Sequence, residues 1–329
     1  MRFIRQVIRQ ENIKNILLEK TREAREHVDV IKLFEPFKDK KIVWLSIGES
    51  LDVFLNKGHD IDIKLNEDEY LFLSSCQEID YMQRIEINLI ENLWKNDIDI
   101  DKVFVINSNS LGNTVNVKYI YWEYFETAIR LLPHNEIDIS KKKHEKKFLC
   151  LNRMTKKHRV DFMNAMKDRN LLNYFNASIW SDKLKLRYDT DDQNTNWWFS
   201  INEEFSYENS MWIVTESVFN NDIDLSFLSE KTFKPILLKM PFVIIGQPYS
   251  LKKLKSLGYK TFSHLWDESY DNILDPQKRM NKIVELVAYL STLDLKKIII
   301  DNAEILEYNY RNLINSRAEK NLLEIMEKI

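Results

Sequence analysis

The feature that most constrains the fold is an alternation of strand-like and helix-like segments that occurs twice. In the first half, apolar segments at 41–47, 70–74 and 102–106 alternate with helical periodicity over 78–95 and 121–132. Strands that alternate with helices in this way favour a parallel sheet covered by helices. The first half is therefore predicted to be an α/β unit.

The same alternation starts again after a polar segment. Residues 133–147 contain the charged run Lys-Lys-Lys-His-Glu-Lys-Lys and are typical of a linker. Strands are then predicted at 148–151, 174–178, 211–215, 242–245 and 260–262, and helices at 156–172, 230–240, 249–257 and onward to the end. A length of 329 residues suits two domains. We predict an α/β protein with two Rossmann-like domains that face a cleft.

The predicted domains are 1–140 and 141–300, with a helix over 301–329 that packs back on the first. Residues 1–34 have the periodicity of an amphipathic helix. With 44% hydrophobic and 30% charged residues, the chain has the composition of an ordered globular protein. Its net charge of −3 provides no field that attracts nucleic acid or acidic membranes.

Targeting and membrane signals are absent from the pattern. The first residues do not form the apolar core of a signal peptide, and no stretch reaches the roughly 18 apolar residues that span a bilayer. We expect a cytoplasmic protein without stable membrane insertion, and buried thiols at Cys76 and Cys150. Five glycines include neither G-x-G-x-x-G nor a Walker motif. Side chains and helix ends would have to hold any phosphate.

The first polar cluster follows the predicted strand 148–151. Asn152 and Arg153 lie at its end, and Thr155 is the predicted N-cap of the next helix. Arg153 suits a phosphate because a helix N-terminus favours anions and arginine adds a bidentate fork. Lys156 joins the candidate set, although a solvated helix face is the favoured interpretation of Lys156 and of the neighbouring cations Lys157 and Arg159.

The second cluster, Thr215-Glu216-Ser217, ends the strand 211–215, where a carboxylate could accept bonds from ribose or sugar hydroxyls. The third, Ser229-Glu230-Lys231-Thr232, opens a helix. Ser229 is the predicted N-cap, Glu230 suits hydroxyls, and Lys231 with Thr232 suits phosphate oxygens. The alternative is that the acid and the base only pair with each other or complement the helix dipole. Pro235 should bend the first turns.

These clusters, followed by Pro-Phe-Val-Ile-Ile-Gly at 241–246, resemble the donor-binding domain of GT-B glycosyltransferases over 148–265, especially the α1,3-fucosyltransferase and exostosin-like group. There, a Glu-Asn-Ser strand end precedes a Thr-Glu-Lys helix start and a Val-Pro-Val-Val-x-Gly-like strand. The resemblance implies that Arg153, Glu216, Glu230 and Lys231 hold the diphosphate and ribose of a sugar nucleotide. The longer connection after Ser217 and the Lys-Pro at 234–235 depart from the pattern. The donor therefore cannot be named.

The resemblance implies a hexosyl- or pentosyltransferase that uses a nucleotide-diphosphate sugar as substrate, with no cofactor. Residues 1–140 would bind the acceptor and 141–300 the donor. The acceptor hydroxyl would belong to a glycan or to a modified DNA base such as a 5-hydroxymethyl pyrimidine. The segment Ser-Glu-Lys-Thr-Phe-Lys-Pro at 229–235 resembles segments of uncharacterised viral proteins, and this resemblance implies a phage origin. Arginine, lysine and helix N-termini could stabilise the diphosphate without a metal, in an inverting reaction.

The candidates for the base that deprotonates the acceptor are Glu49, His59 and Asp60. Glu49 is preferred, because Gly48 allows a turn that presents it to the cleft.

Two alternatives stay open. One is a nonenzymatic binding or structural protein on a degenerate GT-B scaffold. The other is a metal-dependent GT-A enzyme using Asp-x-Asp, but four matches, at 60–62, 97–99, 99–101 and 222–224, indicate composition rather than a site. Packing is the favoured role of the aromatic groups at 119–125 and 197–199, although stacking on a sugar or a nucleobase is the alternative. The oligomeric state is open.

Overall fold

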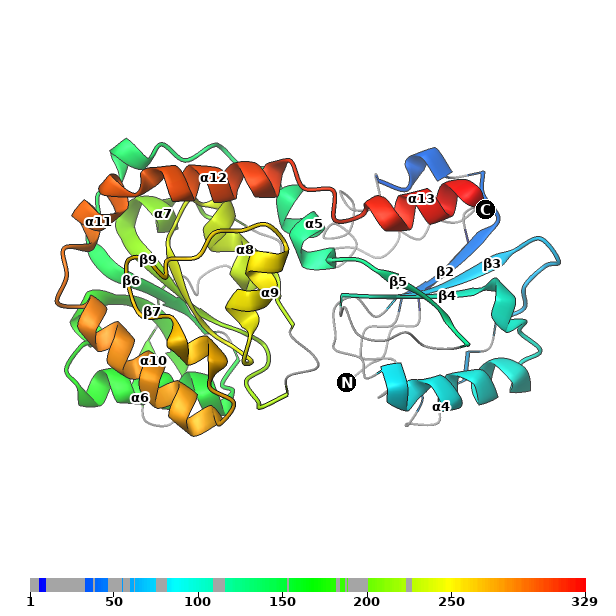
Figure 1. Cartoon of the computed structure of the whole chain (residues 1–329), viewed down its shortest axis with the longest axis horizontal. Helices are drawn as coiled ribbons and strands as arrows, with labels where there is room; N and C mark the ends of the chain where they lie inside the picture. The colour runs from blue at the N-terminus through cyan, green and yellow to red at the C-terminus, as the bar shows by residue number, and fades with distance from the viewer. Residues whose placement is uncertain are drawn as a thin grey trace. The chain divides into compact units, whose positions relative to one another are not determined.

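A computed structural model of the chain describes residues 6–9, 33–37, 39–46, 55, 60–61, 63–74, 82–108, 116–152, 154–181, 184–186, 188, 201–222 and 227–329. The chain divides into two compact units (Figure 1). Unit 1 comprises Met1–Leu131 and Arg317–Ile329, and unit 2 comprises Leu132–Ser316. No helix in the described ranges combines the length and apolarity needed to cross a membrane.

Unit 1 contains a five-stranded sheet in the order β1-β2-β3-β4-β5. Its strands are β1 (Gln6–Arg9), β2 (Ile42–Ser46), β3 (Tyr70–Ser74), β4 (Val103–Asn107) and β5 (Lys118–Tyr121). β1 runs antiparallel to β2, and β2 to β5 are parallel. Figure 1 shows α4 (Met82–Lys95) and α13 (Lys320–Lys328) on opposite faces of this sheet. α5 (Tyr124–Arg130) follows β5.

Unit 2 contains a second sheet in the order β10-β9-β6-β7-β8. Its strands are β6 (Lys146–Leu151), β7 (Phe175–Trp180), β8 (Lys185–Leu186), β9 (Asn209–Thr215) and β10 (Phe242–Ile245), and only β8 is antiparallel to its neighbour. Its α-helices are α6 (Lys157–Asp168), α7 (Glu204–Glu208), α8 (Glu230–Leu237), α9 (Ser250–Ser256), α10 (Pro276–Leu290), α11 (Leu295–Asp301) and α12 (Ala303–Ile314). Figure 1 shows α6 and α10 together on one face and α12 on the other.

Both sheets follow from the sequence pattern. The central strands are continuous apolar runs because helices cover both faces of a parallel sheet, and all residues of β9 and β10 are buried. The predicted fold class, α/β with two Rossmann-like domains, is confirmed. Packing is also confirmed for the first aromatic group, in which Trp122, Tyr124 and Phe125 are buried. The second group, 197–199, lies outside the described residues.

Several local predictions were wrong. Residues 6–9 form β1 and not a helix, because they pair with β2. The sequence pattern also gave no sign of β5. Residues 260–262 form no strand, since the side chain of Asn309 bonds both Lys260 N and Lys260 O in place of a neighbouring strand. Thr155 is not the N-cap, because α6 begins at Lys157 with Lys156 in the capping position.

The division between the units lies at 131/132 and not at 140/141. The segment that follows Leu131 is bonded to unit 2: Lys143 N donates to Tyr207 O at 2.7 Å, and Lys142 Nζ donates to Ser206 Oγ at 2.5 Å. The predicted terminal segment 301–329 is itself divided. α12 packs on α8 in unit 2, whereas α13 packs on β5 in unit 1.

Lys142 carries a buried amine, and burial lowers its pKa from 10.5 to about 7. Between these pH values the unfolded chain binds a proton that the folded protein does not bind, so stability rises with pH across that window. Lys142→Met should raise the free energy of unfolding near neutral pH by about 1 kcal/mol or more and flatten this rise. Urea denaturation at neutral and alkaline pH measures both effects. Lys143→Met, at an exposed neighbour, is the control, and equal behaviour of the two variants would contradict the prediction.

Candidate functional site

The strand order of unit 2 creates a switch point between β6 and β9. From β6 the chain adds β7 and β8 on one side of the sheet, and later β9 and β10 on the other. Open α/β sheets bind ligands at the carboxyl ends of the strands where the order reverses in this way. Asn152 directly follows β6, and Glu216 directly follows β9. Two of the three predicted polar clusters therefore meet at the switch point.

Asn152 and Thr215 join the two strand ends. Thr215 Oγ1 donates to Asn152 Oδ1 at 2.6 Å, and the Asn152 amide nitrogens of the side chain and backbone donate to Cys150 Sγ and to Ser178 O. Both residues are buried. Cys150 is buried as predicted, and this burial raises the pKa of its thiol to about 12. Cys76 lies outside the described residues. Asn152 and Thr215 hold β6 and β9 in register at the site.

Glu216 connects the end of β9 to the start of α8. Its Oε1 accepts from Ser229 N at 3.0 Å and Thr232 Oγ1 at 2.6 Å. Its Oε2 accepts from Ser229 Oγ at 2.5 Å and Ser217 N at 3.0 Å. The carboxylate is fully buried, at 0% exposure. An ionised carboxylate offers about four acceptor positions, so these bonds occupy its capacity.

Glu230 and Lys231 form an ion pair in the first turn of α8. Lys231 Nζ lies 2.5 Å from Glu230 Oε1, and it also lies 3.3 Å from both Ser217 Oγ and Ser229 Oγ. The Lys231 side chain is 17% exposed. Burial raises the pKa of the Glu230 carboxyl, but the charges of Lys231 and Lys234 and the hydrogen bond from Lys231 together outweigh this, and the pKa is lowered. Glu230 is therefore a carboxylate, and Lys231 presents its ammonium at the edge of the site.

Ser229 is the N-cap of α8, as predicted, because its Oγ accepts from Lys231 N. The helix begins at Glu230 and continues through Pro235 to Leu237. Glu230 and Lys231 are paired with each other. This pairing was also expected under the alternative that the two residues have no role in binding a ligand. The 17% exposure of the Lys231 side chain, against 4% for that of Glu230, is what distinguishes the pair from a fully internal salt bridge.

Two residues of α6 form hydrogen bonds with the backbone at the end of β9. His158 Nε2 bonds Glu216 O at 3.0 Å, and Arg159 Nη2 donates to Thr215 O and Glu216 O, both at 3.2 Å. Burial lowers the pKa of His158 to about 4, so the ring is neutral at pH 7 and donates to the carbonyl. Arg159 is 2% exposed, so the expectation that it faces solvent was wrong. Lys157 does face solvent and pairs with Asp161.

The connection between β9 and α8 is held by residues that the sequence patterns did not indicate. Arg279 of α10 is buried and donates to Asn220 O, Gly246 O and two carbonyls that precede α10. Gln247 Nε2 donates to Asn220 Oδ1, and Gln247 Oε1 accepts from Phe227 N, both at 3.0 Å. No motif marks these residues, because most of their partners are backbone groups, which carry no side-chain signal in the sequence.

The remaining predicted residues occupy different settings. Lys156 Nζ donates to Ser217 O at 2.7 Å from an exposed position. In unit 1, the Asp60 carboxylate accepts from Asn92 and pairs with Lys95 at 2.9 Å. The ammonium of Lys95 would make this carboxylate a weaker base. Arg153, Glu49 and His59 lie outside the described residues. Their assignments stay predictions.

The Asp-x-Asp segments have local structural roles where the structure describes them. Asp97 follows α4 with a φ of 52°, and Asp99 caps a short 3-10 helix through Asp101 N. Within the described ranges, no three His, Cys, Asp or Glu residues gather closely enough to hold a metal ion.

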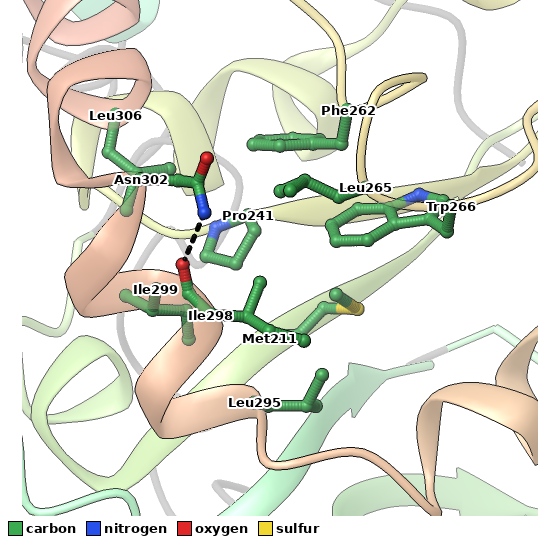
Figure 2. Close-up of a pocket in the computed structure, with 10 residues that line it drawn as sticks. All are labelled: Met211, Pro241, Phe262, Leu265, Trp266, Leu295, Ile298, Ile299, Asn302 and Leu306. Carbon is green, nitrogen blue, oxygen red and sulfur yellow. Dashed lines mark hydrogen bonds between the residues drawn. The ribbon is translucent and has the colours of Figure 1, made fainter.

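A small apolar pocket lies elsewhere in unit 2. Figure 2 shows Met211 of β9 and Pro241, which precedes β10, in the middle of the pocket. Ile298, Ile299 and Leu306 lie to the left in this view, and Phe262, Leu265 and Trp266 lie to the right. Asn302 Nδ2 in this pocket already donates to Ile298 O. The pocket is at the amino ends of the strands, whereas the polar cluster is at their carboxyl ends.

No protein-family description and no curated protein matches the chain. Among solved structures, it is similar to the spinosyn rhamnosyltransferase SpnG complexed with thymidine diphosphate, at 9% identity and a TM-score of 0.40, over 97% of this chain and 80% of that one. It is also similar to a mutant of T4 phage BGT in complex with UDP-glucose, at 11% identity and a TM-score of 0.33, over 79% of this chain and 72% of that one.

Proposed function

We propose that the protein is a GT-B glycosyltransferase that moves a sugar from a nucleotide-diphosphate sugar to a hydroxyl acceptor. The observation that carries the proposal is the position of the Glu230–Lys231 pair: it opens α8 beside the switch point of a Rossmann-like sheet. Ligands of such sheets bind there, and an ammonium at a helix N-terminus suits a diphosphate. A second Rossmann-like unit in the same chain provides a domain for the acceptor.

The proposed roles follow from charge and, for Lys231, from its 17% exposure, whereas the Glu230 side chain is 4% exposed. Lys231 would bind a diphosphate oxygen, with Arg153 and Lys156 as further cations at the same strand ends. Glu230 would accept from the ribose hydroxyls, since the pairing of its carboxylate with one ammonium leaves acceptor capacity. The donor would have to insert beside the ion pair and share the lysine.

The chemistry requires stabilisation of a leaving group and activation of an acceptor. Cleavage of the glycosyl–phosphate bond leaves negative charge on the diphosphate, which Lys231 and the N-terminus of α8 would stabilise. Glu49 is the proposed base that takes the proton of the acceptor hydroxyl, in an inverting reaction that needs no metal. The spacing of Glu216 and Glu230 also differs from the Glu-x7-Glu pattern of many retaining enzymes. A glycan is the preferred acceptor and a hydroxymethylated DNA base the second choice.

Calorimetry against a panel of nucleoside diphosphates and nucleotide sugars tests the proposal. We expect the protein to prefer nucleotides that carry one particular nucleobase. EDTA should leave both nucleotide binding and sugar transfer unchanged. Loss of transfer with EDTA and recovery with Mn²⁺ would contradict the metal-independent mechanism. Binding of no panel member would instead favour a nonenzymatic protein on this scaffold.

A further inference from the structure

Glu216 organises the groups that hold the Lys231 ammonium. Its Oε2 accepts from Ser217 N and Ser229 Oγ. The hydroxyl groups of these two serines are the atoms that lie 3.3 Å from Lys231 Nζ. One carboxylate oxygen therefore fixes both serines beside the ammonium, while the other oxygen fixes the first turn of α8 through Ser229 N and Thr232 Oγ1.

We infer that Glu216 is a positioning residue: it presents the Lys231 ammonium to the donor diphosphate and does not itself contact the donor. Its four bonds and its complete burial leave no acceptor position for a ribose hydroxyl. The earlier expectation that Glu216 binds ribose is replaced by this role. The inference rests on the proposed function for its diphosphate, but the arrangement around Lys231 can be tested without a nucleotide.

The neighbours of Glu216 support a fixed position. The backbone carbonyl of Glu216 receives bonds from His158 and Arg159, and its backbone N donates to Ile245 O at 2.9 Å. Gly246 lies on the adjacent strand end, and a Cβ built there would be 3.5 Å from Glu216 Cβ and 2.9 Å from Ser250 Oγ. The short distance to Ser250 is the one that favours glycine here, whereas the distance to Glu216 is an ordinary van der Waals contact that shows the two strand ends packed together. The backbone of Glu216 is thus held by α6 and by the end of β10, so the carboxylate extends from a fixed point of the chain.

Glu216→Gln keeps the shape of the side chain and removes the charge. The glutamine amide has one acceptor oxygen in place of two, so it can keep only one of the two pairs of bonds that Glu216 now receives. In either orientation of the amide, Ser229 loses a bond and its hold on Lys231 should loosen. Acetylation of Lys231 by acetic anhydride, followed by mass spectrometry, should then be several-fold faster than in the wild type. Binding of pyrophosphate and of the preferred nucleoside diphosphate should weaken by about 10- to 100-fold.

Glu268→Gln is the matched control for stability. Glu268 is a buried carboxylate of unit 2 that accepts from Phe262 N and Thr261 Oγ1, away from the strand ends of the site. Glu268→Gln should leave Lys231 acetylation and nucleotide affinity unchanged. Ser217→Ala is a milder variant that removes one ammonium contact, and it should shift both readouts in the same direction as Glu216→Gln.

A double-mutant cycle separates positioning from contact. If Glu216 acts through Lys231, then Glu216→Gln should not weaken binding further once Lys231→Ala is present. Additive losses would mean that Glu216 contacts the donor directly and would overturn the inference. Equal acetylation of Lys231 in the wild type and Glu216→Gln would overturn it as well. Failure of the wild type to bind any diphosphate would instead refute the proposed function, and the acetylation result would still decide the positioning.

Discussion

Lys231→Ala should lower the rate of sugar transfer by about 10²- to 10³-fold, because it removes a positive charge from the site where the leaving diphosphate gains negative charge. Glu230→Ala should weaken nucleotide binding and abolish transfer through loss of the ribose contact. The measurement is steady-state transfer with the donor that calorimetry identifies, together with the affinity of each variant for the nucleoside diphosphate. Circular dichroism should show that both variants keep the fold.

Lys157→Ala is the matched control for loss of a nearby positive charge. Its side chain is 85% exposed and pairs with Asp161 in the first turn of α6. This variant should transfer sugar at the wild-type rate. If Lys231→Ala and Glu230→Ala both transferred sugar at the wild-type rate, the site would not be at α8 and the proposed function would be wrong.

Glu319→Gln should destabilise unit 1 by about 3 to 5 kcal/mol, because it leaves a buried arginine without a counter-charge. Arg130 Nη2 lies 2.8 Å from Glu319 Oε1, and both side chains are nearly buried. Within the described residues, Arg130 Nε has no hydrogen-bond partner that could compensate. Urea denaturation should show a lower midpoint for the transition of unit 1.

The double variant Arg130→Met with Glu319→Leu is the control for this prediction. Replacement of both charges by apolar groups should recover much of the lost stability, since neither charge is then buried alone. If Glu319→Gln were as stable as the wild type, the Arg130–Glu319 ion pair would contribute little to stability. If the double variant were as unstable as Glu319→Gln, the loss of stability would come from packing and not from the unpaired charge.

The sequence predicted the sheets well, because the signal for a covered parallel strand is local. The run Phe-Val-Ile-Ile predicted β10 with its observed bounds, and 70–74 predicted β3 in the same way. β1 was missed because helical periodicity described residues 6–9 equally well, and only pairing with β2 separates the two outcomes. β5 is a short strand that ends where the predicted helix 121–132 begins, so it produced no separate strand signal.

The site was predicted in part. The N-cap role of Ser229 and the location of two clusters after strands follow from local patterns. The role of Glu216 does not, because its bonds to Ser229 and Thr232 cross a connection whose path the sequence does not show. The buried guanidinium groups of Arg159 and Arg279 were missed for a related reason. Their partners are backbone carbonyls, which carry no sequence signal.

The divided composition of unit 1 has a consequence for biosynthesis. The ribosome makes residues 1–131 first and α13 only after the whole of unit 2. Until then, Arg130 has no Glu319 to pair with and β5 lacks the helix that packs on it. The first unit to be translated is therefore the last to be completed. Unit 2, as one continuous segment, has all of its own residues available before that point.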